Sequence, residues 1–346
     1  MARFSRVRVS RKVVIMVAGG ILLVALGYVL PHVTSPGMPS DEAAYEKWVS
    51  QFGSGLGDRP AVVILEPDAL AQLDSCLNGA QQQERLQMLS YAVKTLQTSN
   101  DQVYLDAGHS NWIPAAQMAT RLKAADVAGA YGFALNVSNF DPTSQEIVYA
   151  NALNQNLGMT KRFVIDTSRN GTSGAAPRAH RAVGSISGAL PGVAGGALAG
   201  QLYTDPDTQA ADWVRTHPGD PRSKEIEQEI ANQPTAMWFG AWSGNITTAV
   251  ASFTSAASLA HKVPILVTYD IPQLNCGGTS NNDEGSWCNP PGHQLGAAPQ
   301  VLDNRGDMGL WIKAPGESDG NCGLGAGTAA GDFSPSLAQD LINGGS

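Results

Sequence analysis

The chain has 346 residues, enough for one large domain with a well-buried core, and it is rich in glycine and sparse in charge. This composition suits a compact enzyme with many tight turns and argues against a disordered or coiled-coil protein. The formal charge is −8 although five of the first twelve residues are basic, so the body of the chain is strongly acidic. Nucleic-acid binding needs clustered Lys and Arg, so the acidic body argues against it. The acidity fits a neutral polymer as ligand, and plain solubility explains it equally well.

Residues 13–30 form an uninterrupted uncharged stretch directly behind the basic start. A basic flank that stays inside, followed by an apolar run, predicts export of the rest of the chain. The run is longer than a usual signal-peptide core and no convincing cleavage site follows it, so a cleaved signal and an uncleaved membrane anchor both fit. We expect an exported protein, extracellular or anchored to the outer face of the cytoplasmic membrane. Residues 1–35 are then the signal or anchor, and residues 36–346 form a single domain.

Seven short apolar runs lack the polar alternation of half-exposed strands, which predicts strands buried on both faces. They cover residues 61–67, 101–107, 131–137, 162–167, 235–241, 263–269 and 309–314. Amphipathic segments such as 83–96 and 115–127 lie between them. Strand–helix alternation at this spacing predicts a parallel sheet or barrel. No phosphate-cradling glycine motif follows any run, which disfavours a nucleotide-binding doubly wound fold.

Acidic or amide side chains stand at the carboxyl-terminal ends of most of these runs. They are Asp68, Asp106, Asn136, Asp166 and Asp270, with Asp319 shortly after the last run. In a parallel barrel these ends share one face, where active sites are built. A single Asp after a strand is usually a turn residue or a helix cap, but five such positions favour a shared polar site.

The four cysteines, Cys76, Cys276, Cys288 and Cys322, are candidates for two disulfides in an exported chain. Spacing alone leaves all three pairings open. There is no CxxC pair and no His-rich companion, so we expect no zinc or other metal and no cofactor.

Eight stretches stand out as motifs along the chain. They are VVILEPDAL (62–70), VYLDAGHSNW (103–112), ALNVSNF (134–140), VIDTSRNG (164–171), MWFGAWSG (237–244), VPILVTYDIPQLNCGG (263–278), WCNPPG (287–292) and WIKAPGESDG (311–320). Together they resemble glycoside hydrolase family 6, the inverting cellulases and cellobiohydrolases. The resemblance spans nearly everything beyond the apolar stretch. It implies an α/β fold, a distorted barrel of about seven parallel strands that forms one catalytic domain and hydrolyses β-1,4-glucans.

The order of these stretches departs from the family, which places MWFGAWSG and YDIP before EPDAL. Exchanging residues 36–173 with residues 174–280 restores the family order, and each block boundary has the sequence Thr-Ser. Each block carries whole strand–helix units, so we expect the strands to keep their family places in space. Residues 174–202, rich in Gly and Ala, give the chain enough length to return from the top of one strand to the bottom of another. The entropic cost of closing such a loop grows slowly with its length. A natural rearrangement, an engineered one and coincidence at the boundaries all fit this order.

The resemblance also implies catalytic roles. Inverting hydrolysis needs an acid that protonates the leaving oxygen and a base that activates water from the opposite face, about 6.5–9.5 Å away. The resemblance assigns the acid to Asp68 and the base to Asp319. The plainer alternatives are a helix cap at Asp68 and a turn residue at Asp319. Family members usually have an Asp where this chain has Asn275, and that Asp supports protonation of the acid, so its charge is missing here.

Other motif residues are implied to hold the acid or the substrate. Asp106 and Asp270 are expected to position their neighbours and to raise the pKa of the acid by like charge, although structural hydrogen bonding explains them nearly as well. Tyr269 is expected beneath the distorted sugar ring, against the alternative of a core tyrosine. The implied stacking platforms and hydroxyl-binding groups are Trp238, Trp112, Trp287, His109, Asn139, Lys313 and Glu317. Tryptophan is otherwise often a core residue, and His109 has no metal partner at ligand spacing.

The resemblance implies the disulfides Cys76–Cys276 and Cys288–Cys322. Only 26 residues follow Gly320, including a predicted helix at 334–343. Little chain therefore remains for long loops that could cover the substrate groove. We therefore expect an open cleft and endo-acting cleavage. The resemblance implies a β-glucan substrate, and we expect a monomer. The alternative is a glucan-binding or cell-wall protein that kept the groove and lost turnover, which Asn275 and the block order favour. No GxSxG elbow is present, which disfavours a serine hydrolase.

Overall fold

The computed structural model describes residues 42–75, 77–98, 100–172, 201–274, 293–303, 305–320 and 327–344. All of them belong to one unit of the chain, Ser35–Ser346. The apolar stretch 13–30, the four cysteines, Asn275 and Trp287 lie outside the described residues, so the export and the disulfides stay predictions. Within the described ranges, no helix has the length and apolarity needed to cross a membrane.

An eight-stranded sheet forms the centre of the fold, in the order β6-β7-β1-β2-β3-β4-β10-β9. From β6 to β10 the described strands all pair in parallel, and β9 pairs antiparallel with β10. The bounds are β1 Ala61–Leu65, β2 Asp101–Asp106, β3 Gly132–Leu135, β4 Arg162–Asp166, β6 Met237–Phe239, β7 Ile265–Thr268, β9 Gln300–Val301 and β10 Met308–Leu310. A small second sheet pairs β5, Gly171–Thr172, with β8, His293–Gln294. All seven predicted strands and the parallel arrangement are confirmed.

The strands are apolar on both faces because each face packs against a different cluster. Val63 and Leu105 belong to a cluster that helical residues such as Leu89 complete. Their chain neighbours Ile64 and Tyr104 point the opposite way and belong to a second cluster. That cluster joins strand residues from β7 round to β10 and has no helical member, so it fills the inside of the curled sheet.

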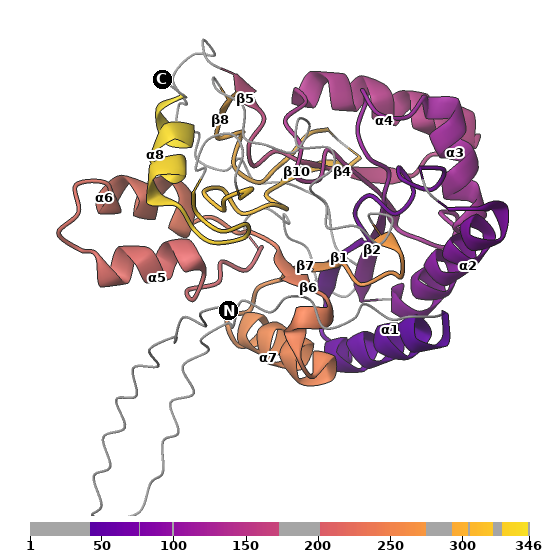
Figure 1. Ribbon diagram of the computed structural model, residues 1–346, viewed down its shortest axis with the longest axis horizontal. Coiled ribbons are helices and arrows are strands. Elements are labelled where there is room, and N and C mark those ends of the chain that lie inside the picture. Colours follow the sequence, from indigo (N-terminus) through magenta and orange to yellow (C-terminus); the bar gives the residue numbers. More distant parts are fainter. Residues whose placement is uncertain are drawn as a thin grey trace, which may run out of the picture. The chain divides into compact units, whose positions relative to one another are not determined.

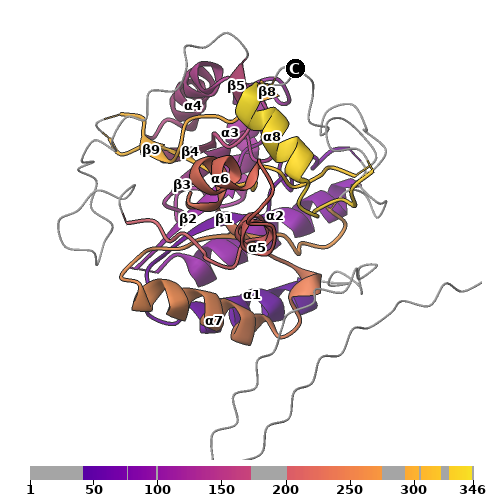
Figure 2. The ribbon, with the colours of Figure 1, turned by 90° about the vertical axis from the view of Figure 1, so that its left-hand side faces the viewer.

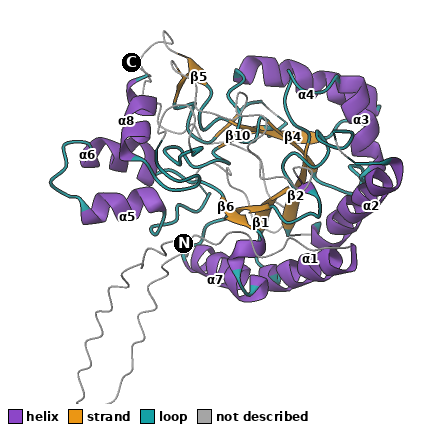
Figure 3. Cartoon of the chain, in the orientation of Figure 1, coloured by secondary structure: helices purple, strands orange, loops and turns teal. Residues whose placement is uncertain are grey.

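The sheet curls until its two ends approach each other. Ala236 N–H donates to Trp311 O at 3.0 Å, and Trp238 Nε1–H donates to Ile312 O at 2.9 Å. These bonds connect the β6 end of the sheet to the segment directly after β10. The parallel strands therefore form a distorted half-barrel, and Figure 3 shows them inside an arc of helices.

Helices cover the outside of the curl (Figure 1). Round this arc follow α7 Ile246–Leu259, α1 Glu42–Leu56, α2 Gly79–Leu96, α3 Ala115–Ala124 and α4 Thr143–Leu157. Local signals set their ends: Asn78 and Gln81 form a capping box at the start of α2, and Gly158 ends α4 in the left-handed conformation at φ 68°. A second group packs around the buried Trp311. It consists of α5 Gln209–Thr216, α6 Ser223–Ile226, the π-helical turn Glu227–Ala231 and α8 Pro335–Asn343.

Helices α1 and α7 come from the two exchanged blocks and lie side by side (Figure 2). A Cβ on Gly55 of α1 would lie 2.7 Å from Val250 Cβ of α7, so only glycine permits this close approach. Arg59 Nε donates to Thr254 Oγ1 at 2.8 Å across the same junction.

The strand order agrees with the expected exchange of residues 36–173 and 174–280. After that exchange the parallel strands follow one another along the chain as β6, β7, β1, β2, β3, β4 and β10. This is their order in the sheet, and neighbouring strands in such folds are usually consecutive in the chain.

Candidate active site

Carboxyl groups from three adjacent strands meet at the carboxyl end of the sheet. Asp68 follows β1, Asp106 ends β2 and Asp270 follows β7. All three side chains are buried. None of the ion pairs among the described residues involves them. Burial without an ion-pair partner disfavours the charged form of a carboxyl group.

Asp68 and Asp106 form a closely coupled pair. The backbone N–H of Asp68 donates to Asp106 Oδ2 at 2.9 Å, and that of Gly108 donates to the same oxygen at 3.1 Å. Burial outweighs these two bonds and raises the pKa of Asp106 to about 6. Burial, and then the charge of Asp106, raises the pKa of Asp68 well above its ordinary value. Asp68 therefore keeps its proton at a pH at which an exposed aspartate is ionised.

Glu66, to which the sequence assigned no role, connects β1 to the loop after β7. Its Oε2 accepts the N–H groups of Asp270 and Ile271 at 2.9 and 3.1 Å, and its Oε1 accepts the Tyr45 hydroxyl at 3.1 Å. Burial raises the pKa of Glu66. Burial, and then the charge of Glu66, raises the pKa of Asp270 to about 8. Glu66 thereby holds the Asp270 loop against the strand that leads to Asp68.

Several residues in the loops after β1, β3 and β7 have left-handed backbone conformations. They are Glu66, Asp68, Asn136, Ser138 and Gln273, with φ between 49° and 73°. A side chain with a Cβ rarely adopts this conformation, and such strained positions cluster at functional sites. Asp68 has a φ of 73°, and its backbone N–H donates to Asp106. The strained residue is therefore also the one that binds the neighbouring carboxyl group.

The ends of β4 and β10 carry a second polar group. Asp319 Oδ2 lies 3.3 Å from Arg169 Nη1, and Glu317 Oε2 lies 2.8 Å from Lys313 Nζ. The buried Asp166 accepts backbone N–H bonds at 3.0–3.2 Å from Ser138, Ser168, Ile312 and Lys313. Asp166 thus anchors the loops after β3, β4 and β10 to one another, while Asp319 and Glu317 face cations.

Two of the predicted substrate-binding residues, His109 and Trp112, lie together after β2. His109 Nδ1 is 2.6 Å from Asp141 Oδ2, and the His109 ring is 5.4 Å from the Trp112 ring. Asn139 is buried, and its Nδ2 donates to Val137 O at 3.0 Å. The His109 and Trp112 side chains retain some exposure, whereas the amide of Asn139 is partly occupied by the backbone.

The predicted aromatic residues after β6 and β7 also meet. The rings of Trp238 and Tyr269 lie 5.5 Å apart with an edge-to-face geometry. Both side chains are half-buried. Of the predicted catalytic groups, the structure therefore joins Asp68 directly to Asp106 and joins Asp270 to this pair through Glu66. Asp319 lies with Arg169 at the other group.

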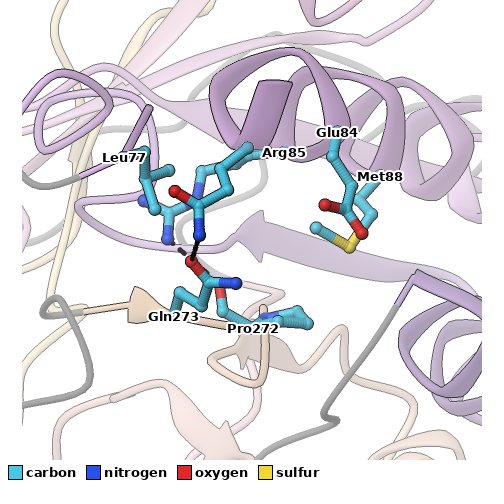
Figure 4. A pocket seen from close by; sticks show the side chains of 7 residues that line it. Leu77, Glu84, Arg85, Met88, Pro272 and Gln273 are labelled. Atoms are coloured by element: carbon cyan, nitrogen blue, oxygen red, sulfur yellow. Dashed lines mark hydrogen bonds between the residues drawn. The ribbon is translucent and has the colours of Figure 1, made fainter. Parts of the chain in front are cut away.

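A shallow pocket lies beside this end of the sheet, between α2 and the loop after β7 (Figure 4). It is lined by Leu77, Gln81, Glu84, Arg85, Met88, Pro272 and Gln273. Gln81 Nε2 donates to Gln273 Oε1 at 2.9 Å. The buried Arg85 donates to Ala69 O at 3.4 Å and to Pro272 O at 3.0 Å. None of the predicted site residues lines the pocket, and its polar contacts fasten the loops after β1 and β7 to α2.

Comparison with known families identifies the family of this chain. The sequence model of "Glycosyl hydrolases family 6" matches residues 33–205, 196–286 and 278–344. The chain belongs to glycosyl hydrolase family 6. A match in overlapping pieces is consistent with the exchanged blocks, and it confirms the resemblance drawn from the motifs.

Named relatives in glycosyl hydrolase family 6 include endoglucanases. Endoglucanase 1 of Streptomyces halstedii is 31% identical over 316 residues, which are 90% of this chain and 64% of that protein. Endoglucanase A of Cellulomonas fimi is 28% identical over 302 residues, which are 87% of this chain and 41% of that protein. The chain thus spans less than two thirds of the length of either relative.

A solved structure of the family supports the fold. The endoglucanase Cel6 from Mycobacterium tuberculosis, in complex with methyl-cellobiosyl-4-deoxy-4-thio-β-D-cellobioside, is 31% identical to this chain. The similarity has a TM-score of 0.52 and covers 88% of this chain and 68% of that one. The predicted distorted barrel is therefore confirmed as a family 6 fold.

Sequence reasoning missed three residues that organise this family 6 site, namely Glu66, Tyr45 and Arg169. Glu66 is the first charged residue after the five apolar residues of β1, which is a signal for a carboxylate at a strand end. Arg169 stands inside the VIDTSRNG motif. Tyr45 lies in α1 with no local sign of its partner, because the partner is Glu66.

Proposed function

We propose that this family 6 chain hydrolyses β-1,4-glucosidic bonds of cellulose-like glucans with inversion, and that it cleaves inside the polymer. The observation that carries the proposal is the buried Asp68–Asp106 pair at the adjacent ends of β1 and β2. Acetal hydrolysis needs an acid that is still protonated when the substrate binds. The raised pKa of Asp68 meets that need.

Asp68 is the general acid in this proposal. Its carboxyl group gives its proton to the glycosidic oxygen while the bond from that oxygen to the anomeric carbon breaks. Asp106, held by the N–H groups of Asp68 and Gly108, keeps a carboxyl oxygen beside Asp68 and raises its pKa. The Glu66 bonds to Asp270 and Ile271 hold the loop after β7 against the segment that leads to Asp68.

Asp319 is the general base in this proposal. A water molecule attacks the anomeric carbon from the face opposite the leaving oxygen and gives its proton to the Asp319 carboxylate, so the product is the α-anomer. Arg169 Nη1 lies 3.4 Å from Oδ1 and 3.3 Å from Oδ2 of Asp319. The guanidinium balances the charge of this carboxylate and limits its orientation.

The strand order arranges the binding residues on both sides of the acid. Tyr269 follows β7 and lies under the distorted sugar ring, with Trp238 of β6 beside it. Trp112 and His109 follow β2, so they lie on the other side of Asp68. The remaining groups for the hydroxyls and sugar faces are Asn139, Lys313, Glu317 and Trp287.

Endo-acting cleavage is supported by the names of the relatives, since the similar proteins from Streptomyces halstedii and Cellulomonas fimi are endoglucanases. With soluble carboxymethyl-cellulose, we expect viscosity to fall early relative to the release of reducing ends. Proton NMR of the first products should show the α-anomer. Steady release of cellobiose with little loss of viscosity would contradict endo action.

A non-catalytic glucan-binding protein is the second candidate, and Asn275 is the residue that favours it. The family motif carries an Asp at this place, so the chain lacks a charge that supports protonation of the acid. We propose a reduced rate rather than none, because Asp68, Asp106 and Asp319 remain. Retention on insoluble β-glucan without release of any sugar would favour the binding protein.

We also propose that the protein is exported and that Cys76–Cys276 and Cys288–Cys322 are disulfides. The uncharged residues 13–30 behind a basic start support export. Leu77 directly follows Cys76 in the sequence, and Gln273 stands three residues before Cys276. Both line one pocket, which supports the first pairing. Non-reducing peptide mapping of exported material tests the pairing, and free thiols or another pairing would contradict it.

A further inference from the structure

Trp242 is a large apolar side chain that the fold leaves 43% exposed at the end of β6. Among the described residues, the other exposed large apolar side chains are Val148, Met159 and Leu259. These three lie in α4, directly after α4, and in the last turn of α7, on the outer helices. Trp242 differs from them because it stands at the carboxyl end of the sheet, beside the candidate active site.

The Trp242 ring extends an aromatic surface that the site already has. Its centroid lies 6.4 Å from the Tyr269 ring, at an interplanar angle of 47°. Trp238 lies 5.5 Å from the same tyrosine ring. Tyr269 thus contacts one half-buried and one exposed tryptophan, and the surface becomes more open toward Trp242.

The turn that carries Trp242 holds the ring in place. A Cβ on Gly240 would lie 2.6 Å from two atoms of the Trp242 ring and 2.6 Å from Tyr269 O, so the ring rests directly on the glycine backbone. Gly240 N–H donates to Ser243 Oγ at 3.1 Å, and Asn245 Oδ1 caps α7 by accepting Thr248 N–H at 3.0 Å. A ring that is exposed and already positioned loses little freedom when it binds a ligand.

We propose that Trp242 is a further sugar-binding platform, which holds a glucosyl unit of a neutral β-glucan beyond the rings of Tyr269 and Trp238. The inference rests on the proposed function and adds a subsite to it. In the order β6-β7-β1-β2, Trp242 and Trp112 lie on opposite sides of Asp68, so Trp242 extends the Tyr269 side of the groove. Its ring would cover the apolar C–H face of a sugar and exclude water from it.

The platform predicts that affinity depends on the length of the oligosaccharide. Only a chain that fills the inner positions and reaches past Tyr269 gains the contact with Trp242. A site that holds sugar units on both outer sides of the acid favours binding within a polymer over binding at its end. The platform therefore accounts for endo action through retention of the substrate, independently of any roof over the groove.

The experiment measures cello-oligosaccharide binding in the Asp68→Asn background, where hydrolysis does not consume the ligand. Titrations with cellotriose and cellohexaose are followed by calorimetry and by tryptophan fluorescence. We expect Trp242→Ala to weaken cellohexaose binding by about 2- to 12-fold, the range for one aromatic contact, and to leave cellotriose binding nearly unchanged. Trp242→Phe should keep most of the affinity, because it keeps a ring.

Leu259→Ala is the matched control, since Leu259 is 84% exposed at the far end of α7. It should change neither affinity. Equal cellohexaose binding by Trp242→Ala and its background would overturn the inference and leave the proposed function standing, provided that the wild type hydrolyses β-glucan. If the wild type hydrolyses no β-glucan and the background binds no oligosaccharide, the proposed function fails and this inference fails with it.

Discussion

The two sides of the carboxyl end of the sheet hold their acidic groups by different means. After β7, β1 and β2, the carboxyl groups meet backbone N–H groups, a tyrosine hydroxyl and one another, and burial raises the pKa of Asp106 to about 6 and of Asp270 to about 8. After β4 and β10, the buried Asp166 also meets backbone N–H groups, but the two more exposed carboxylates face cations, Asp319 facing Arg169 and Glu317 facing Lys313. The first arrangement favours protonated carboxyl groups, whereas a cation compensates a carboxylate. The acid and the base that we propose, Asp68 and Asp319, are the same residue type and differ in their neighbours.

The largest expected effect comes from removing the proposed proton donor on the first side. Asp68→Asn should lower kcat on β-glucan by at least about 100-fold, because general-acid catalysis is lost, while oligosaccharide binding survives. Steady-state rates and a binding titration measure the two effects. Asp58→Asn, at an exposed position, is the control and should keep the wild-type rate. A substantial residual rate in Asp68→Asn would place the acid elsewhere.

The second side is tested through the guanidinium. Arg169→Lys keeps the positive charge but loses the flat group that reaches both oxygens of Asp319 and also Ser138 O. We expect kcat to fall by about 10- to 100-fold, because a misplaced base costs that much, with a smaller change in KM. Arg215→Lys alters an exposed pair with Asp212 and should leave kcat unchanged. Equal rates for the wild type and Arg169→Lys would remove Arg169 from the mechanism.

Restoring the family carboxylate should strengthen the first side. Asn275→Asp adds a negative charge to the motif that also contains Asp270, and we expect kcat at alkaline pH to rise by up to roughly tenfold, the equivalent of one unit in the pKa of the acid. The alkaline limb of the pH–rate profile should move to higher pH, because a neighbouring anion favours the protonated acid. Asn156→Asp, on the exposed end of α4, is the control. A lower rate in Asn275→Asp would show that the asparagine is an adaptation of this chain.

The sequence predicts much of the fold because the signals for it are local. Apolar runs without alternation correctly place the strands, and the acidic residues at their ends gather at the carboxyl end of the sheet as predicted. The pairs that organise the site are not local: Asp68 and Asp106 are 38 positions apart, and Glu66 and Asp270 are 204 apart. Glu66 could not be assigned because β7 follows β1 by a long stretch of chain and pairs with it only in the folded sheet. The choice between a carboxyl partner and a cation partner is likewise made by the packing of loops.

The last prediction concerns stability, and it separates burial from ion pairing. The folded pKa of Asp270 is about 8, above its ordinary value of 3.8, so the native state binds a proton that the unfolded state has lost between these pH values. The free energy of unfolding contributed by Asp270 therefore falls as pH rises from about 4 to about 8 and levels off above that. Asp270→Asn resembles the protonated form and removes this dependence. Urea unfolding at pH 5, 7 and 9 should show that the variant becomes more stable relative to the wild type with each step in pH.

Glu66→Gln removes the neighbouring charge and keeps an acceptor for the N–H groups. Its free energy of unfolding should fall less steeply with pH than that of the wild type. A difference between Asp270→Asn and wild type that stays constant from pH 5 to pH 9 would mean that Asp270 is already ionised in the native state, and the contrast between the two sides would then rest on Asp68 and Asp106 alone.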